Sequence, residues 1–116
     1  MTISDFIKEY NGASDDDARK NVIEKHIVNR YMPYADKIVM AQKAVKLACY
    51  KNGEFAMNTP MLIYLSVTKA IESYTDLRFS EDSPLADFDD MEKQGLCSMI
   101  TDAVGNDFRH IWMLLI

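Results

Sequence analysis

The sequence contains little cysteine, glycine or proline: two, four and three residues respectively among 116. Two cysteines are too few for a disulfide scaffold, which favours a reducing compartment. The scarcity of glycine and proline excludes a collagen-like or long low-complexity chain. No apolar run approaches the roughly 20 residues of a membrane-spanning helix, and a secretion signal is not recognisable at the N-terminus. We therefore expect one soluble domain, residues 1–116, in the cytoplasm.

Motifs for catalysis and cofactor binding are also missing. There is no phosphate-binding loop and no dinucleotide-binding turn. Cys49 and Cys97 lie far apart, so a zinc site would need both of them and both histidines. Neither cysteine has the glycine-rich surroundings of a nucleophile, and we expect both to pack as small buried hydrophobic residues. We therefore expect no enzymatic activity, no catalytic residue, no cofactor and no metal.

Apolar residues recur at intervals of three and four, which is typical of amphipathic helices. Capping residues and prolines mark the expected helix starts: Thr2, Ser14, Pro33, Thr59-Pro60 and Ser83-Pro84. Asn52-Gly53 is expected to end the third helix in a left-handed conformation. We predict helices over about 2–10, 14–31, 33–51, 60–74, 83–94 and 96–105, with a last one from 107.

The segment 60–74 is apolar almost all round its predicted helix. A helix with so small a polar face belongs at the centre of a fold. We therefore predict an all-α bundle of about five to seven helices around it. A buried strand over 61–67 remains the alternative, because a short apolar run fits both structures.

The last six residues, 111–116, are all apolar, whereas chain ends are usually polar. Three explanations stay open: burial within the subunit, docking on another subunit, or truncation relative to longer relatives. An exposed run of this kind would mark an interface.

Charge is segregated along the chain. Residues 20–51 contain seven lysines or arginines and two acids, whereas residues 76–92 contain seven acids and one arginine. Such a molecule can bind its own copies head to tail, although two solvated faces remain the simpler alternative. The net charge of −5 argues against direct nucleic-acid binding. The candidate self-assembly residues are Lys37, Lys43, Lys46, Asp87, Asp89 and Asp90.

Several short motifs resemble those of a known group of proteins. Residues 25–37 read KHIVNRYMPYADK, which is similar to a KHIV-x-x-Y-x-P-Y-x-x-K pattern. Asn58-Thr59-Pro60, Tyr74-Thr75-Asp76 and Gly95-Leu96 match further signatures of the same group. On these motifs, which span about residues 20–100, the chain resembles small helical tail-module proteins of tailed phages and prophages of Gram-positive bacteria.

The resemblance implies a tail assembly chaperone, which binds the tape-measure protein in the host cytoplasm during virion morphogenesis. It also implies a homo-oligomer that binds other phage proteins, has no catalytic residues and does not bind a membrane. The alternative within this group is a structural protein of the virion neck or head–tail connector. A third hypothesis, from the charge pattern, is an acidic DNA mimic that inhibits a host protein.

Individual residues carry further expectations. The eight methionines are most simply explained by core packing, and the functional alternative is a groove that adapts to varied partner segments. Among the matched positions, Tyr31 and Tyr34 are expected to set the angle between helices at Pro33. Tyr74 is expected to bury its ring and hydrogen-bond its hydroxyl. The candidate partner-binding residues are Met32, Met40, Met113, Leu114 and Ile116.

Overall fold

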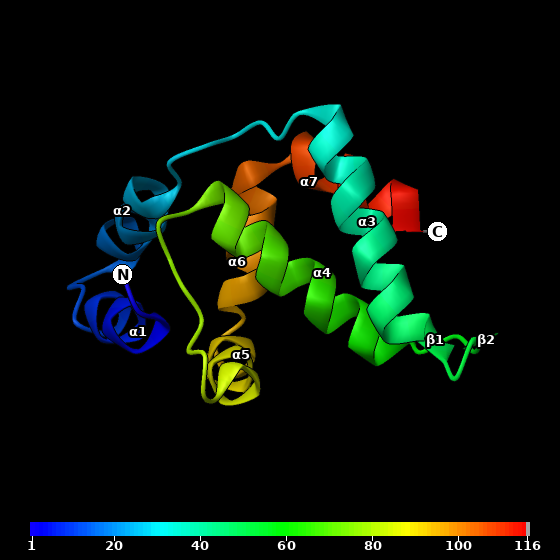
Figure 1. The fold of residues 1–116 in the computed structure, drawn as a ribbon. Helices are drawn as coiled ribbons and strands as arrows, with labels where there is room; N and C mark the ends of the chain where they lie inside the picture. The colour runs from blue at the N-terminus through cyan, green and yellow to red at the C-terminus, as the bar shows by residue number, and fades with distance from the viewer. Residues whose placement is uncertain (116) are drawn as a thin grey trace.

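Helices make up most of the fold (Figure 1). The computed structural model describes residues 1–115, and over this range it contains seven helices and one short hairpin. The helices are α1 (Ile3–Asn11), α2 (Asp16–His26), α3 (Tyr34–Cys49), α4 (Thr59–Tyr74), α5 (Pro84–Lys93), α6 (Leu96–Val104) and α7 (Asn106–Leu115). The hairpin consists of β1 (Tyr50–Lys51) and β2 (Glu54–Phe55). The prediction of an all-α fold is therefore confirmed.

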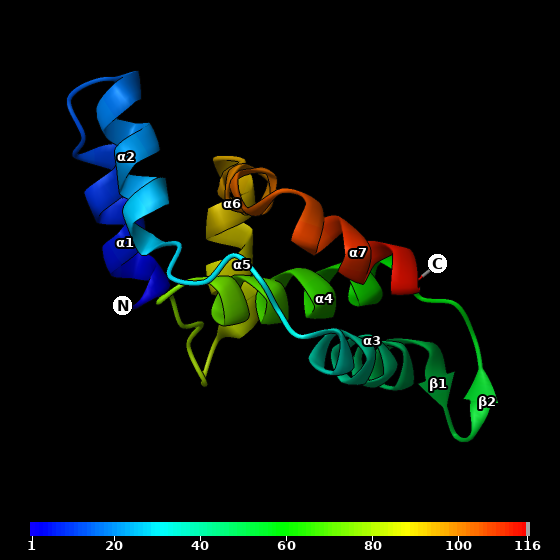
Figure 2. The same cartoon turned by 90° about the horizontal axis from the view of Figure 1, so that it is seen from above.

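Helix α4 lies at the centre of the molecule, as predicted. It packs against α3 on one side and α6 on another, while α7 also packs against α3 (Figures 1 and 2). The buried residues that α3 contributes to this core are three alanines, Ala41, Ala44 and Ala48, and Cys49. Since alanine side chains are short, they allow α3 to approach its neighbours closely. The alternative of a buried strand over 61–67 is wrong.

Buried side chains form two clusters on either side of α4. The first lies between α3, α4 and α7, and receives Leu62 and Tyr74 from α4. The second is formed mainly by α1, α2, α5 and α6, and receives Ile71 from α4. Ile27, which follows α2, packs against both clusters. The molecule is elongated as a result, with extents of 50 × 28 × 19 Å.

Side-chain caps start three of the helices. Thr2 caps α1 as predicted, and its hydroxyl oxygen accepts a hydrogen bond from the backbone N–H three residues later. Asp15 makes the same bond at α2, one residue after the predicted cap, Ser14. Asn58 makes it at α4, one residue before the predicted cap, Thr59. Each error arose because two neighbouring residues both have capping side chains, and only the backbone geometry selects between them.

The predicted end of the third helix is wrong by two residues. Helix α3 ends at Cys49, and Tyr50–Lys51 pairs antiparallel with Glu54–Phe55. Asn52 and Gly53 do adopt the left-handed conformation, with φ of 54° and 80°, but they form the turn of a hairpin. Two consecutive positive φ angles match the twist of a two-residue hairpin loop.

Candidate protein-binding surface

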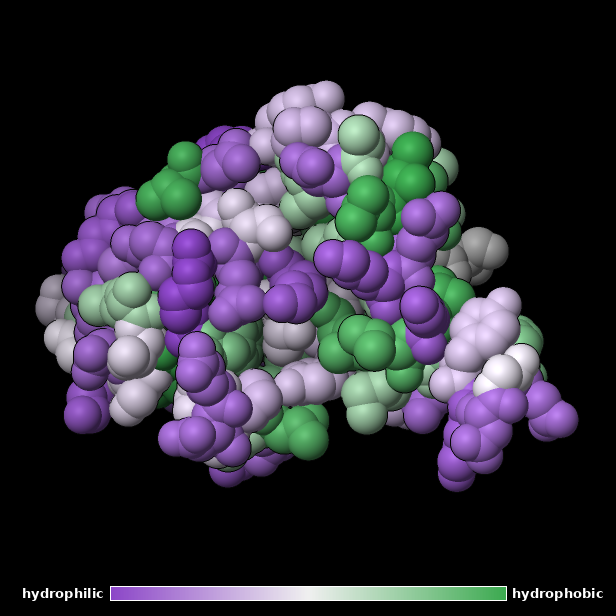
Figure 3. All heavy atoms as spheres, in the orientation of Figure 1, coloured by the Kyte–Doolittle hydropathy of each residue, from purple (hydrophilic) through white to green (hydrophobic). Residues whose placement is uncertain are grey.

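Helix α3 lies at one edge of the molecule and carries two apolar stripes, in which Ile38, Val39 and Leu47 are exposed and Val45 is half-buried. One stripe contains Ile38 and Val45, and the other contains Val39 and Leu47. Leu47 is 71% exposed and Val39 is 48% exposed, on the side of α3 away from its buried alanines. Figure 3 shows hydrophobic side chains over α3, separated by hydrophilic ones. Each stripe borders a groove, one beside α4 and one beside α7.

The groove beside α4, here called the α3–α4 groove, is apolar with a charged rim. Its apolar lining is Val39, Met40, Ala44 and Leu47 of α3 and Leu65 of α4. Lys43 of α3 and Lys69 of α4 supply two positive charges to its lining and Asp36 one negative charge, so the groove is basic on balance, and its cavity volume is about 310 Å³. An apolar helix side chain that is flanked by acids would therefore fit this groove.

The groove beside α7, here called the α3–α7 groove, lies along the other stripe. Its lining includes Ile38, Val45 and Tyr50, together with Leu114 of α7. The hairpin continues this apolar surface, because the Tyr50 and Phe55 rings stack edge to face at 5.4 Å and are both more than half exposed. This groove is also suited to an apolar helical segment.

The candidate partner-binding residues do not form one surface. Met40 lines the α3–α4 groove, Leu114 lines the α3–α7 groove, and Met113 is 70% exposed on α7. Met32 is only 6% exposed and belongs to the first core cluster. Its assignment to a partner surface is therefore wrong, because its side chain serves the core. Ile116 lies outside the described residues.

The apolar C-terminal run is divided between core and surface. Ile111 is fully buried in the first core cluster, whereas Met113 points to solvent. Burial within the subunit thus accounts for part of the run. Contact with another subunit and truncation remain expectations.

Lys37 and Asp107 form a buried ion pair that the sequence analysis did not anticipate. The Lys37 Nζ atom lies 2.7 Å from Asp107 Oδ1, and their side chains are 1% and 10% exposed. Asp107 Oδ2 also accepts hydrogen bonds from the Tyr74 hydroxyl and from the backbone N–H of Met32 at 2.8 Å. The expectation for Tyr74 is confirmed, whereas the assignment of Lys37 to a self-assembly face is wrong because its charge is enclosed.

The hydrogen bonds around Asp107 hold it in the charged form. Burial alone would raise its pKa, but the bonds from Lys37, Tyr74 and the Met32 N–H outweigh it and lower the pKa. Burial and the neighbouring Asp107 carboxylate raise the pKa of the Tyr74 hydroxyl. The carboxylate is fully engaged by its three donors, so this junction joins α3, α4 and α7 structurally.

The tyrosines beside Pro33 do not join the core. Tyr31 and Tyr34 are 61% and 54% exposed. Tyr31 instead lies over the buried cation, with its ring centroid 5.1 Å from Lys37 Nζ. The expectation that these rings set the angle between helices is wrong, since Met32 and the Asp107 junction hold this segment.

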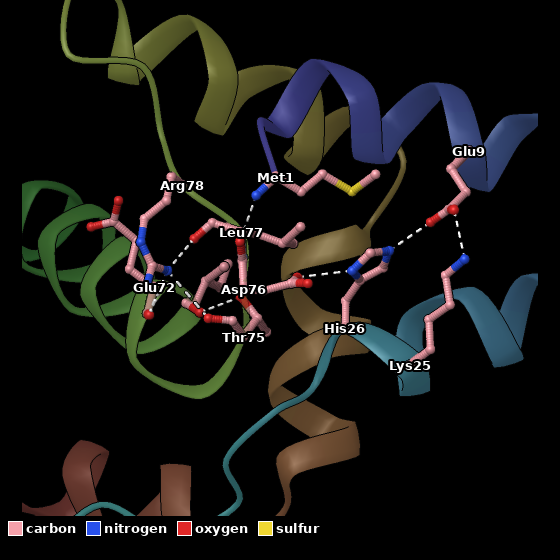
Figure 4. A network of polar contacts seen from close by, with 10 residues as sticks. Met1, Glu9, Lys25, His26, Glu72, Thr75, Asp76, Leu77 and Arg78 are labelled. Carbon is pink, nitrogen blue, oxygen red and sulfur yellow. Dashed lines mark hydrogen bonds and ion pairs between the residues drawn. The ribbon is translucent and has the colours of Figure 1, made fainter.

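A second polar network surrounds His26, which is 7% exposed (Figure 4). Its Nδ1 lies 2.8 Å from an Asp76 oxygen and its Nε2 lies 2.6 Å from a Glu9 oxygen. Because both ring nitrogens face carboxylates, the imidazolium form can donate to both. Hydrogen bonds from Lys25 and His26 lower the pKa of Glu9. Both nitrogens are engaged, so this arrangement fastens α1 and α2 to the segment after α4.

Arg78 completes the network at the end of α4. Its guanidinium donates hydrogen bonds to the carbonyl oxygens of Glu72 and Leu77, at 2.9 and 2.6 Å, as Figure 4 shows. The Met1 amino group donates to the Asp76 carbonyl oxygen at 2.8 Å, and the Arg78 N–H donates back to the Met1 carbonyl. The bond to Glu72 satisfies a backbone oxygen that the end of α4 leaves open, and the others join the N-terminus to the segment after α4.

The acidic helix α5 lies away from α3. It packs against α1 and α6, whereas α3 packs against α4 and α7 (Figure 1). Asp87 is half-buried and accepts a hydrogen bond from the Ser80 N–H at 2.7 Å. Asp89 and Asp90 are exposed, each 3.6 Å from Lys93 Nζ. Of the three candidate acids, Asp89 and Asp90 are therefore the ones that face solvent.

Both cysteines are buried free thiols, at 2% and 3% exposure, as predicted. Burial raises the pKa of Cys97, which keeps this thiol protonated and unreactive. Over residues 1–115, no group of three His, Cys, Asp or Glu side chains is arranged to hold a metal ion. Within the same range, none of the helices has the length and hydrophobicity required to cross a membrane.

No family model matches the chain, and neither a curated protein nor a solved structure matches it. The two apolar grooves beside α3 are therefore the main guide to function.

Proposed function

We propose that this chain is a non-enzymatic protein-binding module that acts as a phage tail assembly chaperone and binds the tape-measure protein. The observation that carries the proposal is the α3–α7 groove with its adjoining hairpin. Ile38, Tyr50 and Phe55 are each more than one-third exposed there. The phage role itself rests on the motif resemblance in residues 20–100.

The geometry of α3 supports a helical partner. Ile38 and Val45 lie two turns apart along one side of α3, which corresponds to roughly 10 Å of helix, and Tyr50 continues this surface at the start of β1. An amphipathic helix places its own anchors at i, i+3, i+4 and i+7, over a similar length. A chaperone of this kind would shield apolar tape-measure segments until the tail tube forms around them.

The two other functional hypotheses make different demands. A connector protein would have this surface closed permanently by a neighbour in the virion. A DNA mimic would need a long row of exposed carboxylates, whereas Asp87 is half-buried and bound to a backbone N–H, so only Asp89 and Asp90 of the three candidate acids face solvent. The available acids therefore favour the DNA mimic least.

Co-expression with neighbouring tail genes, followed by affinity capture and mass spectrometry, tests the proposal. We expect wild-type protein to recover the tape-measure protein, and Ile38→Ser/Tyr50→Ser to lose about tenfold or more of it. Val28→Ser is the control, because Val28 is 65% exposed and lies outside both grooves. Recovery of portal or head protein instead, with this chain present in finished particles, would favour the connector role. Equal recovery by wild type and the double variant would contradict the proposed surface.

A further inference from the structure

Helix α5 carries an exposed leucine among acids. Leu85 is 58% exposed, and Asp89 follows it by four residues, so these two side chains lie on the same side of the helix. Asp90 is exposed further round the helix. Glu81 and Asp82 are exposed immediately before the helix. An anchor of this kind fits an apolar site with a basic rim.

The α3–α4 groove has the complementary chemistry. Val39 and Leu47 stand two helical turns apart on α3, and Leu65 lines the groove from α4. Lys43 and Lys69 bring one cation from each helix. Lys43 is exposed, and Lys69 lies 3.9 Å from a single carboxylate, Glu72, at 66% side-chain exposure. Both lysines are therefore accessible to acids on a partner.

We infer that the α3–α4 groove binds helix α5 of a second copy of this chain. Leu85 of one copy enters the groove between Val39 and Leu47 of the next, and its neighbouring acids approach Lys43 and Lys69. The groove and its ligand are different surfaces of one chain, so one copy can bind a second copy through its groove and a third copy through its α5. Repetition produces a ring or an open row of copies.

This contact is distinct from the surface in the proposed function. Tape-measure binding uses the α3–α7 groove, whereas self-association uses the α3–α4 groove on the other side of α3. A row of copies would present its α3–α7 grooves repeatedly along an extended partner. The contact is small, because a ten-residue helix is only about 15 Å long. We therefore expect a low affinity, with an associated fraction that rises with protein concentration.

Charge reversal on each half provides the test, with sedimentation velocity and light scattering as readouts. We expect wild-type protein to associate as its concentration rises. Lys43→Glu/Lys69→Glu and Asp89→Lys/Asp90→Lys should each weaken self-association by about tenfold or more. An equimolar mixture of the two variants should associate again, because each then finds a groove or helix of opposite charge.

Matched controls change the same charge elsewhere. Lys8→Glu/Lys20→Glu and Glu54→Lys/Asp102→Lys alter exposed residues outside the proposed contact, and should associate like wild type. A wild-type protein that stays monomeric at every concentration would overturn the inference. So would a mixture of the two reversed variants that remains dissociated while both are folded by circular dichroism.

Cysteine cross-linking tests the apolar half separately. Leu47→Cys and Leu85→Cys are purified singly, mixed and treated with oxidised glutathione. Two thiols lose two protons and two electrons to form the disulfide, and one oxidised glutathione is reduced to two glutathione thiols. We expect a disulfide-linked dimer on a non-reducing gel. Its yield should be at least several-fold higher than the yield from Val28→Cys mixed with Leu85→Cys. Equal yields would contradict the docking of position 85 in this groove.

The two proposals can fail independently. Ile38→Ser/Tyr50→Ser should abolish tape-measure capture and preserve self-association. Lys43→Glu/Lys69→Glu should abolish self-association and preserve capture by a single copy. Loss of both properties in either variant would show that the two grooves do not act separately, and would overturn the division of roles.

Discussion

At the scale of single residues, Asp107 connects segments that are far apart in sequence. Its carboxylate binds a lysine on α3, a tyrosine on α4 and a backbone N–H in the segment before α3. A buried charge of this kind is stable only while it is compensated. The stability of this half of the molecule therefore depends on individual atoms at the junction.

Replacing Lys37 tests this dependence. We expect Lys37→Met to lower the free energy of unfolding by about 3–5 kcal/mol, because it leaves Asp107 buried without a cation. Lys46→Met, on the exposed side of the same helix, should change it by less than about 0.5 kcal/mol. Urea unfolding monitored by circular dichroism measures the free energy of unfolding of both variants. Similar values for the two variants would show that the Lys37–Asp107 pair does not contribute.

The lowered pKa of Asp107 gives stability a definite pH dependence. The folded carboxyl releases its proton more readily than the unfolded one, whose ordinary pKa is 3.8. Its contribution is therefore fully present above that value and is lost as pH falls through the lower, folded pKa. We expect the difference in unfolding free energy between wild type and Asp107→Asn to be constant near neutrality and to shrink below about pH 4. Urea titrations at several pH values measure this difference, and a difference that grew in acid would contradict the assignment.

At the scale of elements, local signals decide where helices begin, and neighbouring residues compete for the same cap. Asn58, and not Thr59, accepts the hydrogen bond from the third residue of α4. Asparagine and threonine are both good N-cap residues, so the residue type alone does not show which of them caps the helix. The Asn-Gly turn is a similar case, since its left-handed geometry ends a helix in one context and reverses a hairpin in another.

The two capping candidates of α4 can be separated by mutation. Asn58→Ala should lower the free energy of unfolding by about 1 kcal/mol, because the Met61 N–H loses its acceptor. Thr59→Ala should change it by less than about 0.5 kcal/mol, since its side chain makes no capping bond. Thermal and urea unfolding provide the measurement. The reverse order of effects would place the cap at Thr59, as first predicted.

At the scale of the whole molecule, two core clusters on either side of α4 produce an elongated subunit with separated charges. The basic and acidic segments were recognisable from sequence, but their exposed members were not. Lys37 is buried and Asp87 is half-buried, whereas Lys43, Lys46, Asp89 and Asp90 face solvent. The candidate site was predicted only in part, because exposure depends on which helices pack together.

Scattering in solution tests the whole-molecule picture. At low concentration we expect a radius of gyration close to the 14.7 Å of the Cα trace. Raising the concentration at low ionic strength should increase it as copies associate end to end. Added salt at about 1 M should reverse much of the increase, because it shortens the Debye length to about 3 Å. Growth that is equally strong at both ionic strengths would argue against charge complementarity as its cause.

The sequence by itself determined the helical class, the central position of α4 and the approximate bounds of most helices, but the second helix was predicted to reach residue 31 and ends at His26. These follow from contacts between residues three and four apart and from caps, which are local in the chain. Only the tertiary structure decided that Met32 and Lys37 are buried, that a carboxylate some 70 residues away pairs with Lys37, and that two grooves flank α3. Burial and pairing at these positions depend on how distant helices pack, and a periodic pattern of apolar residues carries no information about which distant partner will be present.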